Sequence, residues 1–578
     1  MSLQRAVELH AAGRTTDALV LLFNTVADPA RTVPAADEKQ LLAALLEGVV
    51  LNSGNAVIHD VLVQLLHDPL IDAQQVTRAV LGLITATPQF AVVEEISTLP
   101  DDEIDTERLA GALHDLLALP LLRALLPRAI VSEPRTERVM AFARRALLSL
   151  LTGDVPNESW HWDAVHLVAQ AAFAGEYAWV ERDDEAEFVD AAAAHLTGWL
   201  AAGVEAADGT EAPAPLLLLY TMYRRLTVIP RWERLAGVPE RAWEPFRPWM
   251  DATLETHVRQ RLVERTLGDH VPSLVPDTHV AGETMHGHAD TVVSARVRAM
   301  YEEHPYPRWS SLAVSRRTTV RSLIRELAGR EGPDPSQRIL IAGCGTGRQA
   351  AHTARSFPDA RILALDLSRA SLGYAVRMTH ALGIANVDYM QGDLLDLGRL
   401  SEQFSLIFCS GVLHHMHDPR AGWATLVERL HQRGIMKIAL YSTIARRAVT
   451  AARDLLDSET RAGSDADVRA VRERLLALPP QHPARAVIES TDFYSLSGCR
   501  DLVMHVQERT YSIPQLGLEL EALGLRFLGF QLPVTVQQAF SREFPAAGAA
   551  RSLDAWAAFE ERHPLTFWGM YQFFVDRR

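Results

Sequence analysis

The chain has 578 residues, of which 48% are hydrophobic and 22% charged, with 30 prolines and 33 glycines. This composition is typical of a globular protein of several domains and excludes a disordered or fibrous one. The net charge is −15; because the residues from Tyr301 onward carry +3, the first 300 carry −18, which argues against nucleic acid as a partner. Lys39 and Lys437 are the only lysines, so we expect no lysine-based catalysis.

The sequence carries no evident targeting or membrane segment. Its longest aliphatic run, Leu216 to Leu219, is far too short to span a bilayer. The N-terminus lacks a basic segment followed by an apolar one, so we expect no signal peptide and a cytoplasmic protein. Cys344, Cys409 and Cys499 are too few and too scattered for a disulfide framework, and we expect them to be buried thiols.

The first half of the chain predicts helices. From Leu3 to about Val263, apolar residues recur at spacings of three and four. Examples are 40–51, 141–151 and 188–202. The segment 6–18 resembles half of a tetratricopeptide unit, but no second copy follows, so a plain helical hairpin is the stronger interpretation. We divide this half into a tetratricopeptide-like region, 1–150, and a second helical region, 151–290.

The second half predicts a parallel sheet. A polar stretch rich in glycine, histidine and proline, 268–291, marks the boundary, and an aromatic connecting segment, 291–335, follows. Beyond it, short apolar runs alternate with helical patterns, which predicts an α/β domain over 336–578 with helices on both faces of its sheet. The predicted strands are 338–342, 361–365, 387–390, 404–409, 435–440, 525–530 and 566–575. Residues 441–524, the insertion, would overhang the carboxyl ends of the strands as a lid that binds the acceptor.

A glycine loop joins the first predicted strand to a helix, with the sequence Gly343-Cys344-Gly345-Thr346-Gly347. Glycine permits the backbone angles of such a turn and lets a ligand approach the backbone at a helix N-terminus. The stretch that starts at Gly345 also satisfies the dinucleotide pattern G-x-G-x-x-A. A nicotinamide oxidoreductase therefore stays an alternative.

Two acidic residues end neighbouring strands. Asp366 lies 19 residues after Gly347, where a carboxylate can accept hydrogen bonds from both ribose hydroxyls of a bound cofactor. This position suits NAD equally well. Asp393 follows the third strand, where an acid can accept a hydrogen bond from an adenine amino group; this favours an adenosyl cofactor without pyrophosphate. Each acid also has a plainer interpretation, which is to cap a loop or the next helix.

The fourth predicted strand continues into S-G-V-L-H-H-M-H-D-P, residues 410–419. With the glycine loop and the two acids, this segment makes residues 335–440 resemble the class I S-adenosylmethionine-dependent methyltransferases. The resemblance implies a Rossmann-like seven-stranded sheet, preceded here by an all-α helical domain, and S-adenosyl-L-methionine as the cofactor. The implied cofactor-binding residues are Gly343, Cys344, Gly345, Gly347, Asp366, Leu367, Asp393, Leu394, Ser410 and Gly411.

Further motifs extend the resemblance to a bacterial family that joins a tetratricopeptide-like region to such a domain. They are P-Y-P-R-W at 305–309, M-K-I-A-L-Y-S at 436–442, R-D-L-V-M-H-V-Q-E at 500–508 and M-Y-Q-F at 570–573. One departure concerns Ile341, because family members usually carry an acid at that position. Contacts to the methionine ammonium must therefore come partly from elsewhere.

Methyl transfer requires the acceptor to be held in line behind the methyl carbon, with water excluded. An amine or alcohol acceptor must also lose a proton. The candidates for this role, or for positioning the acceptor, are His414, His505, Glu508, Tyr306 and Tyr441. Arg308 and Arg500 are candidates to anchor a carboxylate, with ordinary structural salt bridges as the alternative.

The acceptor and the ligands leave several classes open. The histidines and aspartate of 414–418 do not converge easily on one ion from a strand end, so we predict no metal. A helical array suits a polypeptide ligand or a self-contact. We therefore favour a protein or peptide side chain as the acceptor over a small metabolite, and expect no membrane partner; a homo-oligomer through the helical region stays open. A scaffold that binds the cofactor without turnover is the non-enzymatic alternative.

Overall fold

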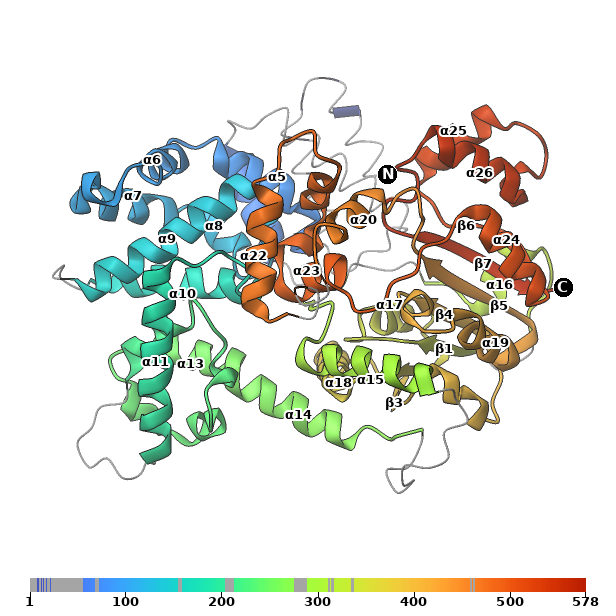
Figure 1. The fold of residues 1–578 in the computed structure, drawn as a ribbon, viewed down its shortest axis with the longest axis horizontal. Coiled ribbons are helices and arrows are strands. Elements are labelled where there is room, and N and C mark those ends of the chain that lie inside the picture. Colours follow the sequence, from blue (N-terminus) through green and yellow to red (C-terminus); the bar gives the residue numbers. More distant parts are fainter. Residues whose placement is uncertain are drawn as a thin grey trace.

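The computed structural model describes residues 56–67, 72–153, 158–202, 213–274, 288–309, 312, 317–333, 337–457, 460 and 463–578, with six scattered residues before 56 (Figure 1). The predicted helix 40–51 lies outside the described residues, as does most of the tetratricopeptide-like segment 6–18. Within the described ranges, no single helix is long and apolar enough to cross a membrane, although one sharply bent helix pair, 73–96, satisfies length and composition.

The second half contains one mixed sheet with the strand order β3-β2-β1-β4-β5-β7-β6. The strands are β1 (Arg338–Ala342), β2 (Arg361–Asp366), β3 (Val387–Gln391), β4 (Phe404–Ser410), β5 (Leu430–Leu440), β6 (Leu525–Phe530) and β7 (Tyr571–Arg577). The first five pair in parallel, and β7 runs antiparallel between β5 and β6. The predicted Rossmann-like seven-stranded sheet is therefore confirmed.

Two strands begin at a different residue from the one predicted. β5 begins at Leu430, earlier than predicted, and β7 begins at Tyr571 rather than at 566. The later start of β7 has a local cause: Thr566 and Trp568 donate backbone hydrogen bonds to His563 and Leu565, which makes a turn of this apolar run. Apolar residues are common to turns and strands alike, so hydropathy did not separate the two here.

Helices cover both faces of the sheet. In β1, Ile339 and Ile341 belong to one core layer, while Leu340 and Ala342 belong to the other, as expected for a strand buried on both sides. One layer holds residues of α16 (Val320–Ala328), α17 (Arg348–Ser356) and α18 (Arg369–Ala381). The other holds residues of α19 (Pro419–Arg429), α24 (Ile513–Ala522), α25 (Val534–Glu543) and α26 (Leu553–Arg562).

The described part of the first half is helical and shares one large hydrophobic core. Its α-helices are α4 (Ala56–His67), α5 (Ala73–Thr85), α6 (Pro88–Ile96), α7 (Thr106–Leu117), α8 (Pro120–Leu125), α9 (Pro134–Thr152), α10 (Ser159–Ala174), α11 (Asp183–Ala202), α12 (Ala214–Tyr220), α13 (Arg247–Leu254) and α14 (Gln260–His270). The helices predicted at 141–151 and 188–202 lie within α9 and α11. The predicted all-α character of this region is confirmed.

Helix α14 carries the helical half onto the sheet domain, as Figure 1 shows. It packs on α18 with almost no space between the two backbones: a Cβ at Gly268 would lie 2.5 Å from the carbonyl oxygen of Arg369, and a Cβ at Gly373 would lie 2.0 Å from that of Glu264. Only glycine allows the two backbones to come this close. The close packing of α14 on α18 therefore joins the two halves before the chain reaches residues 275–287.

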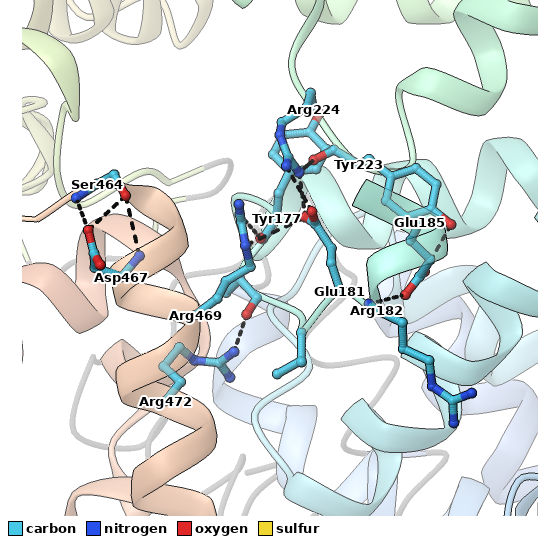
Figure 2. Close-up of polar contacts among 12 residues, drawn as sticks. Tyr177, Glu181, Arg182, Glu185, Tyr223, Arg224, Ser464, Asp467, Arg469 and Arg472 are labelled. Carbon is cyan, nitrogen blue, oxygen red and sulfur yellow. Dashed lines mark hydrogen bonds and ion pairs between the residues drawn. The ribbon is translucent and has the colours of Figure 1, made fainter. Parts of the chain in front are cut away.

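The insertion lies between the helical half and the sheet (Figure 1). Its helices include α20 (Arg447–Arg453), α22 (Asp465–Leu476) and α23 (Leu496–Val503). Figure 2 shows Arg469 and Arg472 of α22 reaching the loop that contains Tyr177 and Glu181. The fully buried Arg472 also forms a 2.6 Å ion pair with Glu137 of α9. The insertion is therefore anchored on the helical half.

Candidate functional site

A cavity of about 950 Å³, the first cavity, lies at the carboxyl ends of β1, β2 and β4. Its walls come from the glycine loop, from these strand ends, from α15 (His288–Glu303) with the segment that follows it, and from the insertion. Parallel α/β sheets bind their ligands at this edge.

The glycine loop lines the cavity with backbone. Gly343 and Gly345 have positive φ angles of 74° and 52°, which side-chain-bearing residues rarely adopt. A Cβ at Gly345 would lie 2.9 Å from the carbonyl oxygen of Tyr306. Cys344 is a buried free thiol between them. Gly347 is not in the cavity wall; it is the N-cap residue of α17, and a Cβ there would lie 2.5 Å from the Cβ of Ala375 in α18.

Asp366 ends β2 beside this loop. Its Oδ2 accepts the Gly345 N–H at 2.7 Å and its Oδ1 accepts the Ser368 N–H at 3.0 Å. Burial raises the pKa of this carboxyl, although the backbone donors oppose the shift. Because a carboxylate has about four acceptor positions, Asp366 can accept a further hydrogen bond from a ligand in the cavity. This donor set fits ribose hydroxyls.

The remaining predicted cofactor contacts are Leu367, Asp393, Leu394, Ser410 and Gly411, and all of them line the first cavity. Asp393 also accepts the Leu395 N–H at 3.0 Å and thereby caps the 3-10 helix η6 (Leu394–Arg399). The capping role considered in the sequence analysis therefore applies to Asp393 as well. Apolar side chains next to two acids match the chemistry of an adenosyl group. The residues present therefore fit S-adenosylmethionine.

A second part of the first cavity, the chamber, is lined by Tyr301, Tyr306, His415, Tyr441, Asp492 and Asp501. The Tyr301 hydroxyl donates to Asp501 at 2.8 Å, and the Tyr306 hydroxyl donates to Asp492 at 2.6 Å. Burial raises the pKa of both carboxyls. Among the described residues, no arginine, lysine or histidine forms an ion pair with either acid. Arg446 also lines the first cavity, but it pairs with Glu508, so neither of the two buried acids has a cation of its own among the described residues.

His415 turns one ring nitrogen toward a backbone carbonyl. Its Nδ1 lies 2.7 Å from the Gln507 oxygen, and since a carbonyl only accepts, Nδ1 carries the proton and Nε2 is left as an acceptor. Burial lowers the pKa of His415, so the ring is neutral at pH 7. Its face stacks on His505 at 3.6 Å.

Three of the predicted catalytic residues lie behind the chamber. His414 is fully buried, stands outside the cavity wall and packs on Tyr441, and neither of its ring nitrogens has a hydrogen-bond partner among the described residues. His505 supports His415 through the stack. Glu508 pairs with Arg446 at 2.6 Å. The predicted Tyr306 and Tyr441 do line the chamber.

Sequence reasoning missed four chamber residues: Tyr301, His415, Asp492 and Asp501. A signal existed for His415, which is adjacent to His414, but only the 3-10 turn Leu413–His415 decides which ring faces the cavity. Asp501 is an acid directly before the apolar residues 502–504 of the motif at 500–508. Its burial, in a helix of the insertion, was the missing information.

The two predicted carboxylate anchors do not reach the chamber. Arg500 forms its hydrogen bonds within the insertion: it donates to Asp465 at 3.1 Å and to the Gly463 carbonyl at 2.5 Å. Arg308 lies 3.3 Å from Glu176 and lines a second cavity. Neither guanidinium therefore contacts the glycine loop.

One trio has metal-ligand chemistry. His415, Asp501 and His505 offer ligand atoms within 4.8 Å of one another. The two rings, however, are stacked with only 23° between their planes, so their in-plane lone pairs run side by side instead of converging as a tetrahedral ion requires. His505 Nδ1 also accepts the Gln507 N–H at 3.1 Å. The three residues are therefore better suited to form part of the chamber wall, with their rings stacked, than to bind a metal ion.

Residues 339–434 match the family described as "Methyltransferase domain". An uncharacterised protein of Synechococcus sp. is 33% identical over 255 residues, which are 42% of this chain and 60% of the relative. The trans-aconitate 2-methyltransferase of Deinococcus radiodurans is 31% identical over 128 residues, 22% of this chain and 47% of the relative.

Among solved structures, PKMT2 from Rickettsia typhi in complex with AdoHcy aligns with 16% identity and a TM-score of 0.36, over 45% of this chain and 52% of that chain. The chain spans about half to three-fifths of the length of the curated relatives named above. The matched region, 339–434, contains the glycine loop and both strand-end acids. The tetratricopeptide-like interpretation of the first residues stays a prediction.

Proposed function

Since residues 339–434 form a class I S-adenosylmethionine-dependent methyltransferase domain, we propose that the whole protein methylates an amine nitrogen of a polypeptide side chain. When bound, S-adenosylmethionine supplies a methyl group activated by a positively charged sulfur. The observation that carries the choice of acceptor is the chamber, where two buried acids that form no ion pair among the described residues lie next to the glycine loop, and the nearby Arg446 is taken up by Glu508.

An amine suits this chamber because it arrives as an ammonium. Asp492 and Asp501 are buried, where attraction between opposite charges is much stronger than in water. The aromatic rings of Tyr301 and Tyr306, which also line the chamber, would add cation–π attraction. The chamber therefore favours a positively charged group over a neutral one before the proton is lost.

His415 is positioned to take that proton. Its Nε2 is the free acceptor of a neutral ring, and its Nδ1–H is fixed by the Gln507 carbonyl. A fixed tautomer keeps the acceptor nitrogen of the ring ready as a general base. Tyr306 and Asp492, held to each other by a hydrogen bond, would orient the amine and exclude water.

A slender acceptor is supported by the burial of the chamber. His415, Tyr441 and Asp501 are each less than one-tenth exposed. Only a narrow group can reach them, and a lysine side chain carries its amine on a flexible four-carbon stem. The helical half and the anchored insertion provide the surrounding surface that a polypeptide needs.

A small carboxylic acid is the second candidate, because one relative is a trans-aconitate 2-methyltransferase. The chamber disfavours it, since an anionic acceptor would meet Asp492 and Asp501, while the nearby Arg446 is already paired with Glu508. Like charges in a desolvated site repel strongly.

The test is transfer of a labelled methyl group from S-adenosylmethionine into fractionated host lysate by the full-length protein, with Asp366→Ala as the control whose cofactor binding is weakened. We expect base-stable label in the protein fraction. Base-labile label would indicate carboxylate esters, and label confined to small molecules would indicate a metabolite acceptor; either contradicts the proposal. Binding of S-adenosylhomocysteine without any transfer would favour the scaffold alternative.

A further inference from the structure

A second cavity, of about 580 Å³, lies where the helical half meets the sheet domain and the insertion. Its walls come from α10, α13 and α14 of the helical half, from α18 of the sheet domain, and from the segment 306–309. We propose that this cavity binds a small organic anion through phosphate or carboxylate oxygens.

The first argument is the shortage of acceptors around two arginines. Arg225 Nη2 and Arg308 Nε lie 3.1 and 3.3 Å from the same oxygen of Glu176. The other oxygen of Glu176 accepts the Ser497 N–H at 2.7 Å. Each guanidinium has five N–H donors, yet within the described ranges neither has another ion pair, and the Arg308 Nε makes no hydrogen bond although it is buried. The cavity therefore faces unused donors.

The position of the shared carboxylate is fixed by the backbone. Glu176 and Tyr177 both have positive φ angles, 55° and 65°, which are uncommon for residues other than glycine. Glu176 is only 3% exposed. It cannot swing to serve both guanidinium groups fully, so the remaining donors stay directed at the cavity.

The second argument is the charge balance. Arg261 and Arg377 also line the cavity and share the single carboxylate of Glu264, at 3.4 and 2.9 Å. Four arginines thus meet two glutamates. Of the other charges in the lining, Arg348 pairs with Asp72, Arg128 donates to the Leu66 carbonyl and Asp492 accepts the Tyr306 hydroxyl. The lining as a whole thus has six arginines and four carboxylates.

The like charges affect one another. Burial and the neighbouring Arg308 lower the pKa of Arg225, and burial is also the main cause of the lowered pKa of Arg261. The same surroundings lower the pKa of His257 to about 3, so this ring adds no charge. An anion would relieve this repulsion.

The third argument is the apolar part of the wall, which favours an organic anion over a bare ion. The Arg308 guanidinium lies 5.8 Å from the ring centres of both Phe173 and Tyr374. Trp309 also lines the cavity. Aromatic walls with a few polar groups are typical of small-molecule sites, and guanidinium groups suit phosphate and carboxylate equally.

The test is calorimetric titration of the full-length protein with inorganic phosphate, pyrophosphate, succinate and citrate, against chloride at equal ionic strength. We expect saturable binding of at least one oxyanion, and the separate phosphate and carboxylate arms identify the class. Arg225→Gln should weaken this binding by about tenfold or more. Glu176→Gln should tighten it, because the internal competitor is removed; a gain of affinity cannot result from misfolding.

The matched control is Arg330→Gln. Arg330 and Arg526 share the buried carboxylate of Asp576, each at 2.8 Å, in the same way that Arg225 and Arg308 share Glu176, but far along the chain from the second cavity. Its anion affinity should equal that of the unmodified protein. Equal affinity in Arg225→Gln, or no binding beyond chloride, would overturn the proposal.

Discussion

The two cavities of this protein share a wall and differ in charge. Tyr306, Pro307, Arg348 and Asp492 line both. The chamber adds a second acid, Asp501, while in the second cavity Arg225 and Arg308 compete for one glutamate. Because unpaired buried charge is costly, each excess indicates a ligand of opposite sign. A cavity suited to a cation and a cavity suited to an anion thus lie on the two sides of one shared wall, which includes Tyr306 and Pro307.

The largest effect should be a loss of folding stability when the insertion is no longer anchored on the helical half. Arg472→Met leaves the buried Glu137 without its partner, and removing one partner of a buried ion pair costs about 3–5 kcal/mol. Urea unfolding followed by circular dichroism measures this loss. In the control Arg562→Met, whose pair with Glu543 is half exposed, the loss should stay below about 1 kcal/mol. Equal losses would show that the insertion is not anchored through Arg472.

The next effect concerns the chamber alone. His415→Gln removes the proposed base and should lower turnover about 100-fold, while the binding of S-adenosylhomocysteine is unchanged. Because burial lowers the pKa of His415 below the usual 6.5, the acid limb of the pH profile of the unmodified protein should lie below that pH. The exposed neighbour His417 provides the control, His417→Gln. Full turnover in His415→Gln would remove this residue from the mechanism.

Asp366→Ala should weaken ligand binding in the first cavity and leave ligand binding in the second cavity unchanged. The loss of the ribose acceptor should weaken S-adenosylhomocysteine binding by about 1–3 kcal/mol, measured by calorimetry, whereas anion binding in the second cavity should not change. Asp388→Ala, an exposed acid on β3 paired with Arg361, is the control and should bind normally. Unchanged binding in Asp366→Ala would place the ribose elsewhere.

The smallest effect concerns Lys437, which lines the first cavity four residues before Tyr441, about 13 Å along β5. Burial lowers its pKa to about 8. Between pH 8 and about 10.4 the unfolded chain binds more protons at this side chain, so the stability of the unmodified protein should rise there.

Lys437→Met should accordingly be more stable than the unmodified protein at pH 7, with the gap closing as the pH rises from 8 to about 10.4. Thermal unfolding of both proteins across this range measures the gap. A difference that is independent of pH would show that charge burial is not its cause.

The sheet and the cofactor part of the site were accessible from sequence because their signals are local. Ile339 to Ala342 form an apolar run that ends in glycine, and Asp366 directly follows another. Parallel strands bring such ends to one edge, so the glycine loop and this acid could be placed together. The orientation of His415 against His414 could not, because a single 3-10 turn sets it.

By itself, the sequence determined the fold class, the strand series and the adenosyl chemistry, since short apolar runs and glycine turns act over a few residues. Only the tertiary structure decided the charges of the two cavities. Asp492 and Asp501 enter the chamber from the insertion, and Arg225 meets Arg308 from another part of the chain. Whether a charged side chain is paired, and which cavity it faces, depends on contacts between residues far apart in sequence.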